Sequence, residues 1–423
     1  RFHSKALDEL VGAALAHNHD LKATLAALEA AHETLLAQRG AFLPAVSAGF
    51  AASRQQAASV LAPVPNYPLV PQEFEYSLFT PQLTISYAPD LFGLNRRTRE
   101  SLEAQEQAAR FEAVAVWTTL TTNVVVTAVE AASLEEQVTL TRKLIALERQ
   151  ALAILELRFR HGDASRLDVT AQQSQVAATE AGLPALVKQL AGARHGLAVL
   201  TGRFPVQAPS PALSLGDLSL PRDLPLSLPS RLVTQRPDVR QARADLRAAS
   251  AAIGIAAAAR LPSLELTASA GSTALAIERV FTSGTGFWGI AASLAAPIFE
   301  GGALRHAELA AKAAYVEAAQ SYRSTVLGAF QNVADTLVAL EQDANALSAA
   351  AAEEQAARTT LDLSRLQLRH GYIGVFELLS AEQAYQQAAL TLTQAEASRF
   401  ADTAALYQAL GGGWWHHADL AAP

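Results

Sequence analysis

A short turn motif occurs twice in this chain, each time between two long stretches of helical pattern. The first copy is Arg160-His161-Gly162, and the second, about half the chain later, is Arg369-His370-Gly371. Basic residues suit the end of a helix, and glycine suits a left-handed cap after it. An acid, Asp168 or Glu377, follows each glycine at the same offset. The chain is therefore predicted to contain two helical hairpins built to one plan, an internal two-fold repeat.

The helices on either side of these turns are expected to be long. The helical pattern runs over 94–161 without proline or glycine, and over 303–370 with only Gly328 inside. At 1.5 Å per residue each stretch is roughly 100 Å of helix. Returning helices are expected over 166–201 and 375–410. Apolar residues recur along the long stretches at spacings of three and four, which is typical of coiled coils.

Four shorter segments alternate apolar and polar or small residues, as strands with one apolar face do. They lie at about 45–54, 76–88, 263–272 and 286–296. Each is about ten residues long, the length of a transmembrane β-barrel strand. Four strands cannot close a barrel, and open sheet edges in lipid leave backbone groups unpaired.

Two architectures satisfy this constraint. Three copies of the chain can share a twelve-stranded barrel that continues into a tube of helices. Alternatively, the protein is a soluble coiled-coil rod with a small sheet at one end. The pattern alone leaves both open.

The same features divide the chain into four parts. The first structural repeat is expected over 1–202 and the second over 231–413. Prolines are frequent over 203–230, which indicates a connector between the repeats. The remaining 414–423 are expected to be a tail.

Composition excludes several functions. The net charge of −7 gives no basic face for nucleic acid, and the absence of cysteine excludes thiolate metal sites. The histidine pairs near the two ends, His17 with His19 and His416 with His417, are better explained as exposed residues than as metal ligands. No catalytic constellation occurs in a convincing context, so no enzyme activity, cofactor or metal is expected. No uninterrupted apolar run reaches 18 residues, so no transmembrane helix is expected.

Three segments carry a resemblance to a known family. They are 228–242 (LPSRLVTQRPDVRQA) and the two strand-to-helix junctions, 89–97 (PDLFGLNRR) and 297–305 (PIFEGGALR). Together they resemble the outer-membrane factors of tripartite efflux systems, the TolC/OprM-type family, and specifically its NodT-like lipoprotein branch. The resemblance covers nearly the whole chain, with the motifs in the family's order.

This resemblance implies a mainly α homotrimer with a shared twelve-stranded transmembrane β-barrel in the outer membrane of a Gram-negative bacterium. A long coiled-coil tunnel would extend into the periplasm, with the connector in an equatorial region. The implied function is passive export of drugs or other small molecules, as in multidrug resistance. The implied partners are a periplasmic adaptor and an inner-membrane pump of the RND type. The alternative is a periplasmic coiled-coil adaptor or scaffold without a pore.

The resemblance places the hairpin turns at the periplasmic tip of the tunnel. Asp168 and Glu377 would then form rings of carboxylates near the pore axis and constrict the entrance, which disfavours anions. For Asp168 a second interpretation stays open, a capping box with Ser165. Ser380 stands where the family often has an acid, which changes the chemistry of the constriction.

Glycines and arginines complete the set of candidate site residues. Gly162, Gly371 and Gly374 resemble the tip glycines on which adaptor hairpins dock, and two of them are also expected to cap helices. The strand-to-helix junctions carry a glycine and an arginine each: Gly93, Arg97, Gly301 and Arg305.

Overall fold

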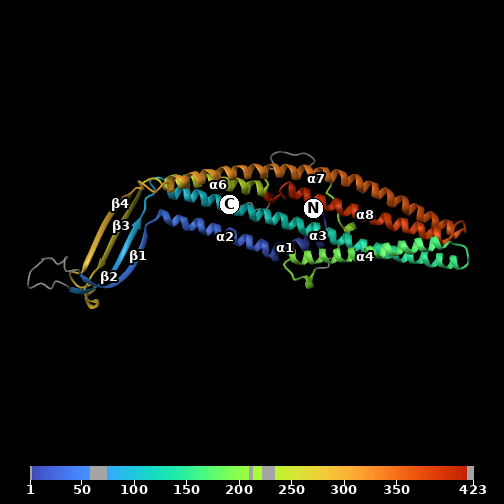
Figure 1. Cartoon of the computed structure of the whole chain (residues 1–423), viewed down its shortest axis with the longest axis horizontal. Coiled ribbons are helices and arrows are strands. Elements are labelled where there is room, and N and C mark those ends of the chain that lie inside the picture. Colours follow the sequence, from blue (N-terminus) through green and yellow to red (C-terminus); the bar gives the residue numbers. More distant parts are fainter. Residues whose placement is uncertain (1, 58–73, 209–212, 222–233, 417–423) are drawn as a thin grey trace, which may run out of the picture. The chain divides into compact units, whose positions relative to one another are not determined.

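The computed structural model describes residues 2–57, 74–208, 213–221 and 234–416, and helices make up most of them (Figure 1). The α-helices are α1 (Lys5–His17), α2 (His19–Arg39), α3 (Leu94–Arg160), α4 (Arg166–Leu200), α6 (Pro237–Ala258), α7 (Ala303–Arg369) and α8 (Val375–Ala409). Short 3-10 helices are η1 (Gly40–Phe42), η3 (Pro205–Gln207), η4 (Leu215–Asp217), η5 (Ile277–Arg279) and η6 (Trp414–His416). The long helices begin and end within one or two residues of the expected bounds.

Four strands form one antiparallel sheet in the order β1-β2-β3-β4. They are β1 (Ala45–Ala57), β2 (Phe74–Tyr87), β3 (Ser263–Ser272) and β4 (Gly286–Ala295). The first hairpin is longer than expected because its ladder continues to the pair Ala57↔Phe74. Near this end, an ion pair of 2.6 Å joins Arg54 to Glu75 across the strands.

The register of the sheet gathers the apolar side chains on one face. Directly paired residues lie on the same face of a sheet. Val46 pairs with Ile85, Ile85 with Ala268, and Ala268 with Ile290, so one apolar row crosses all four strands. The next row, from Ser47 through Thr84 and Ser269 to Gly289, is polar or small. The predicted alternation is therefore confirmed, and the pairing turns it into one continuous apolar face.

A shared cap at Asn18 separates α1 from α2. The backbone N–H of Asn18 donates to Ala14 at the end of α1, and its Oδ1 accepts from the N–H of Leu21 in α2. Its Nδ2 also donates to the carbonyl of Leu200. One amide side chain thus ends α1, starts α2 and ties both to the end of α4.

Two compact units draw segments from both halves of the sequence. Unit 1 comprises Arg1–Ala27, Arg110–Gln241 and Arg323–Pro423, and unit 2 comprises Leu28–Ala109 and Ala242–Tyr322. Unit 2 contains the sheet and the starts of α3 and α7, and unit 1 contains the two hairpin turns. The division into two sequence repeats therefore stays a prediction.

Unit 1 has the main hydrophobic core. It is built from α1, the middle of α3, the ends of α4 and α8, and η4. Val124 and Leu197 are fully buried there, and Leu215 of the Pro-rich connector is 2% exposed. The described part of the connector therefore packs on the core, whereas 209–212 and 222–230 lie outside the described residues.

The tail was predicted to begin at residue 414, which is too early, because residues 414–416 are folded. Trp414 is only 5% exposed, and its indole N–H donates to the carbonyl of Gln235 at 3.0 Å. Residues 414–416 belong to the folded unit because this aromatic side chain is packed and hydrogen-bonded. Residues 417–423, which include His417, lie outside the described part.

One helix among the described residues meets the length and hydropathy of a membrane span. An 18-residue window in α3 has a mean hydropathy of 1.3, and 39% of it is buried. The sequence-based expectation of no transmembrane helix considered only uninterrupted apolar runs, so it did not include this window. The signal is weak, because core helices pass the same test, and Val124, Ala128 and Val129 of α3 are each at most 1% exposed in the core of unit 1.

Candidate functional site

The two hairpin turns have the same backbone hydrogen bonds. At the end of α3, Gly162 N–H donates to Phe159 and the N–H of the next residue donates back to Arg158 at 2.8 Å. The end of α7 repeats both bonds around Gly371. Gly162 has φ +82° and Gly371 φ +75°, and neither has an atom within 4 Å of the place of a Cβ. The predicted caps are confirmed, and glycine is required for its backbone conformation rather than for space.

Asp168 is held by a capping box at the start of α4. Its Oδ2 accepts from the backbone N–H of Ser165 at 3.0 Å and from its hydroxyl at 2.8 Å. Its own N–H donates to Ser165 Oγ at 3.1 Å. These bonds, with the hydroxyl first and a smaller contribution from Arg158, hold the pKa of Asp168 below its usual value. The capping interpretation is confirmed, and the pore role stays a prediction.

Glu377 occupies the matching place in the second hairpin without the same bonds. Gly374 is the N-cap of α8 and offers no side-chain hydrogen bond. Glu377 is exposed, and its Oε2 lies 2.7 Å from where a Cβ of Gly374 would be. Ser380, one turn further along α8, is also exposed. The second turn therefore presents a carboxylate that folds back toward Gly374 rather than one committed to a capping box.

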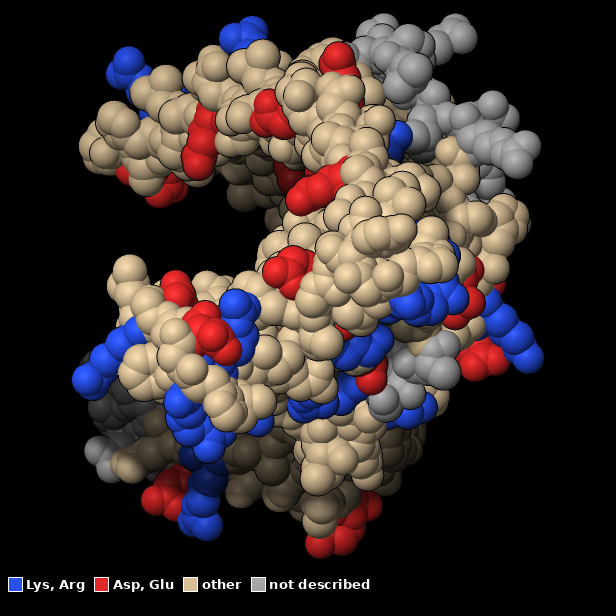
Figure 2. Space-filling model, turned by 90° about the vertical axis from the view of Figure 1, so that its right-hand side faces the viewer, with Lys and Arg blue, Asp and Glu red and all other residues tan. Residues whose placement is uncertain are grey.

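Large apolar side chains are exposed around both turns. Leu167 is 75% exposed, Tyr372 81% and Val375 50%. Both turns belong to unit 1, and Figure 2 shows acidic and basic side chains on the face of the protein that it presents. Sequence reasoning singled out the glycines and missed these neighbours. The signal that could have found them was bulky apolar residues inside a turn-forming segment.

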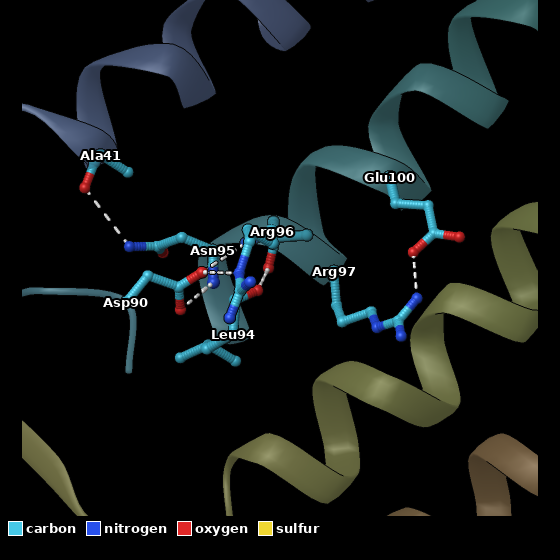
Figure 3. A network of polar contacts seen from close by, with 8 residues as sticks. Ala41, Asp90, Leu94, Asn95, Arg96, Arg97 and Glu100 are labelled. Atoms are coloured by element: carbon cyan, nitrogen blue, oxygen red, sulfur yellow. Dashed lines mark hydrogen bonds and ion pairs between the residues drawn. The ribbon is translucent and has the colours of Figure 1, made fainter. Parts of the chain in front are cut away.

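The first strand-to-helix junction depends on Asp90 (Figure 3). One of its oxygens accepts from the N–H of Asn95 at 3.1 Å, and the other accepts from the N–H and Nε of Arg96 at 2.9 and 3.3 Å. Burial alone would raise the pKa of Asp90, but the hydrogen bonds from Arg96 and Asn95 hold it below its usual value. Gly93, with φ +83°, lets the chain turn just before α3. Asp90 was part of the resembling motif, but its role was not foreseen.

Arg97 packs against another helix of unit 2. Its Nη1 pairs with Glu100 at 2.5 Å, and a Cβ on Gly254 of α6 would lie 2.9 Å from its Cγ and Cδ. The absence of a side chain at Gly254 thus lets the stem of Arg97 cross α6 closely.

The second junction differs from the first. Gly301 and Gly302 both have positive φ, at +58° and +89°, and the residue at the place of Asp90 is Ile298, which is 98% exposed. Arg305 lines a surface groove of about 250 Å³ with Ile298 and Phe299, and within the described residues it has no ion pair. The two junctions match in sequence but not in capping.

In the segment 228–242, which carries the family resemblance, the arginines stabilise the fold. Arg236 is 8% exposed and forms two hydrogen bonds to the carboxylate of Asp238, at 3.1 and 2.8 Å. It also donates to the carbonyl of Ala409 at the end of α8, at 2.9 Å. Arg240 lies over the rings of Phe111 and Trp414. These contacts fasten the start of α6 to the end of α8, and residues 228–233 of the motif lie outside the described part.

Within the described residues, no three His, Asp or Glu side chains are placed to hold a metal ion.

Comparison with known proteins identifies relatives of this chain among the outer membrane efflux proteins. The family model for outer membrane efflux proteins matches residues 10–203 and 228–412. The pyoverdine export outer membrane protein OpmQ of Pseudomonas putida is 32% identical over 420 residues, which are 98% of this chain and 87% of the relative. The solvent efflux pump outer membrane protein SrpC of Pseudomonas putida is 28% identical over 98% of this chain and 86% of its own length.

Solved structures agree with these relatives. The open state of the outer membrane channel MtrE of Neisseria gonorrhoeae has a TM-score of 0.83 at 28% identity and covers 97% of this chain and 90% of its own. The channel OprN has a TM-score of 0.84 at 25% identity and covers 97% and 91%. These matches favour the channel over the poreless scaffold. The chain therefore belongs to the outer membrane efflux protein family.

Proposed function

We propose that three copies of this chain form the outer-membrane exit channel of a tripartite efflux pump. The sheet is the observation that carries the proposal. Its order leaves one side of β1 and one side of β4 without a partner among the described residues. Its apolar face is exposed, with Trp288 and Ile290 each 78% accessible. A lipid-facing sheet needs closed edges, and three sheets of four strands supply the twelve of a barrel.

The first experiment is the mass of the detergent-solubilised particle together with its conductance in a planar bilayer. A conducting trimer is expected. A monomer that stays in solution without detergent would contradict the proposal.

A matched pair of variants tests the lipid-facing side of the sheet. Ile290→Glu places a charge on the apolar face and should reduce the outer-membrane fraction strongly, because a charge facing lipid costs up to about 2–4 kcal/mol. Ala291→Glu places the same charge on the other face of β4 and should insert normally. Equal behaviour of the two variants would show that neither face meets lipid.

The proposal assigns Asp168 and Glu377 to the constriction of the periplasmic entrance, with Ser380 beside them. Both carboxylates are exposed near the turns, which supports this assignment. Glu377→Gln should raise conductance or weaken block by multivalent cations. Asp168→Asn keeps an acceptor for the Ser165 cap, so it separates charge from capping. Unchanged conductance and block in the double variant would remove both acids from the gate.

The proposed adaptor-docking surface consists of Gly162, Gly371 and Gly374 with the exposed Leu167 and Tyr372. A periplasmic adaptor would cover these side chains and connect the channel to an inner-membrane pump. Gly374 has φ −88°, so Gly374→Trp adds bulk without backbone strain. This variant and Tyr372→Glu should abolish export while the trimer mass stays unchanged. Normal export by both would exclude docking at this surface.

A further inference from the structure

Unit 1 contains a cavity that none of the roles above uses. Its volume is about 540 Å³, and it lies between α3, α7 and α8. Cavities of this size hold small organic molecules in other proteins. Leu361, only 3% exposed, is part of its lining.

The two acids of the cavity share one cationic partner. Arg365 pairs with Glu382 of α8 at 3.2 Å and with Asp362 of its own helix at 3.7 Å. One guanidinium therefore serves both carboxylates that line the space.

The other two cations have no such partner. Lys143 of α3 and Arg358 of α7 both line the cavity, and neither forms an ion pair with any residue that the structure describes. The lining holds three cations and two carboxylates, an excess of one positive charge, and the two cations without an ion pair repel each other and attract an anion. The excess charge at this place is positive even though the whole chain carries −7.

The cavity also offers an acceptor without a donor. The Oε1 of Gln386 lines it, is buried and has no hydrogen-bond partner among the described residues. A buried amide oxygen without a donor costs free energy, which a ligand hydroxyl or amine in the cavity would recover.

We propose that this cavity binds a small oxyanion, a carboxylate or phosphate, between Lys143 and Arg358. A hydroxyl of the same molecule donates to Gln386. The bound anion connects α3 of the first hairpin to α7 of the second, and its negative charge replaces the repulsion of the two cations by attraction to both. Binding therefore stabilises the packing of the two hairpins.

The test uses the detergent-solubilised full-length protein in its native oligomeric state, with citrate and inorganic phosphate as separate probes. Calorimetric titration should show binding of at least one probe, and the same probe should raise the melting temperature, because a ligand of the folded state stabilises it by mass action. Added sodium chloride should weaken the binding, since charges in an open cavity are screened. Absence of both heat and melting shift with both probes would overturn the proposal.

Matched variants show whether the binding belongs to this cavity. Lys143→Gln with Arg358→Gln should weaken binding at least about tenfold per cation, the usual contribution of a charge-assisted contact. Lys188→Gln with Arg323→Gln removes the same charge from exposed positions of α4 and α7 outside the cavity and should leave the affinity unchanged. Equal loss in the two double variants would show a general charge effect and would overturn the site.

Gln386→Leu tests the acceptor. It should weaken citrate, which has a hydroxyl, more than tricarballylate, the same tricarboxylate without the hydroxyl. An affinity for citrate equal to that of the native protein would remove Gln386 from the site. The oligomer mass and conductance are recorded for every variant, so that a failure of the anion site is distinguished from a failure of the channel.

Discussion

Asp90 shows at the scale of one residue how a strand is connected to a helix of 67 residues. The first N–H groups of a helix have no partner within the helix, and the carboxylate of Asp90 accepts from two of them at the start of α3. Its side chain is only 11% exposed, so water is a poor replacement. Because the hydrogen bonds lower its pKa, this stabilisation is present at neutral pH and is lost as the pH falls through the pKa of the folded state.

Asp90→Ala should therefore lower the free energy of unfolding by about 1–2 kcal/mol, the usual loss for a helix cap. The melting temperature of the solubilised protein measures the change. Glu103→Ala removes an exposed ion pair with Arg99 further along α3 and should cost less than about 0.5 kcal/mol. The difference between the two variants should shrink at acid pH, and a difference independent of pH would contradict the capping role.

At the scale of elements, α7 and α8 place two acids together. Burial first, and then the hydrogen bond and the charge of Asp402, together raise the pKa of Asp343 to about 6, while Arg399 opposes these effects. Its Oδ2 is buried without a hydrogen-bond partner among the described residues. The folded state thus holds this proton more tightly than the unfolded chain, so stability falls as the pH rises from 3.8 to about 6, and the full loss is present above about pH 6.

Asp343→Asn should raise the melting temperature more at pH 8 than at pH 5, because the cost of ionising Asp343 in the folded state is reached in full only above about pH 6. Thermal unfolding at the two pH values is the measurement. Asp335→Asn on the exposed surface of the same helix serves as the control and should show no such pH dependence. A stabilisation that is equal at both pH values would show that charge is not the cause.

At the scale of the whole molecule, a single chain leaves apolar side chains of α7 uncovered. Leu327 is 71% exposed and Val338 59%. They are eleven residues apart, close to three turns, so they lie on the same face of the helix. Such a face is expected to be covered by another copy in the trimer.

Leu327→Lys combined with Val338→Lys should weaken trimer formation at least tenfold, because two apolar contacts are replaced by charges that must be desolvated. Native mass spectrometry of the solubilised protein gives the fraction of trimer. Asn332→Lys with Ala346→Lys adds two charges on another face of α7 and should leave the trimer intact. A trimer fraction unaffected by the first pair would place this face away from the interface.

The features that were predictable before the fold was known are those that depend on neighbours along the chain. Gly162 and Gly371 were predicted as caps because only glycine adopts positive φ without strain, and the helices and strands followed from apolar periods of three to four and of two. The junction and connector motifs are continuous stretches of sequence, so they indicated the family without knowledge of any tertiary contact.

The contacts between residues that are distant in the sequence were not predictable and became visible in the folded chain. Arg236 reaches Ala409 across 173 positions, Arg97 crosses Gly254, and Lys143 faces Arg358 in one cavity. The capping role of Asp90 was not predicted for a related reason. The matching position in the second repeat is Ile298, so comparison of the two repeats gave no reason to single out an acid at this position. Periodicity records which face of an element is apolar, but the partner of that face depends on packing, and packing is a property of the folded chain rather than of any one segment.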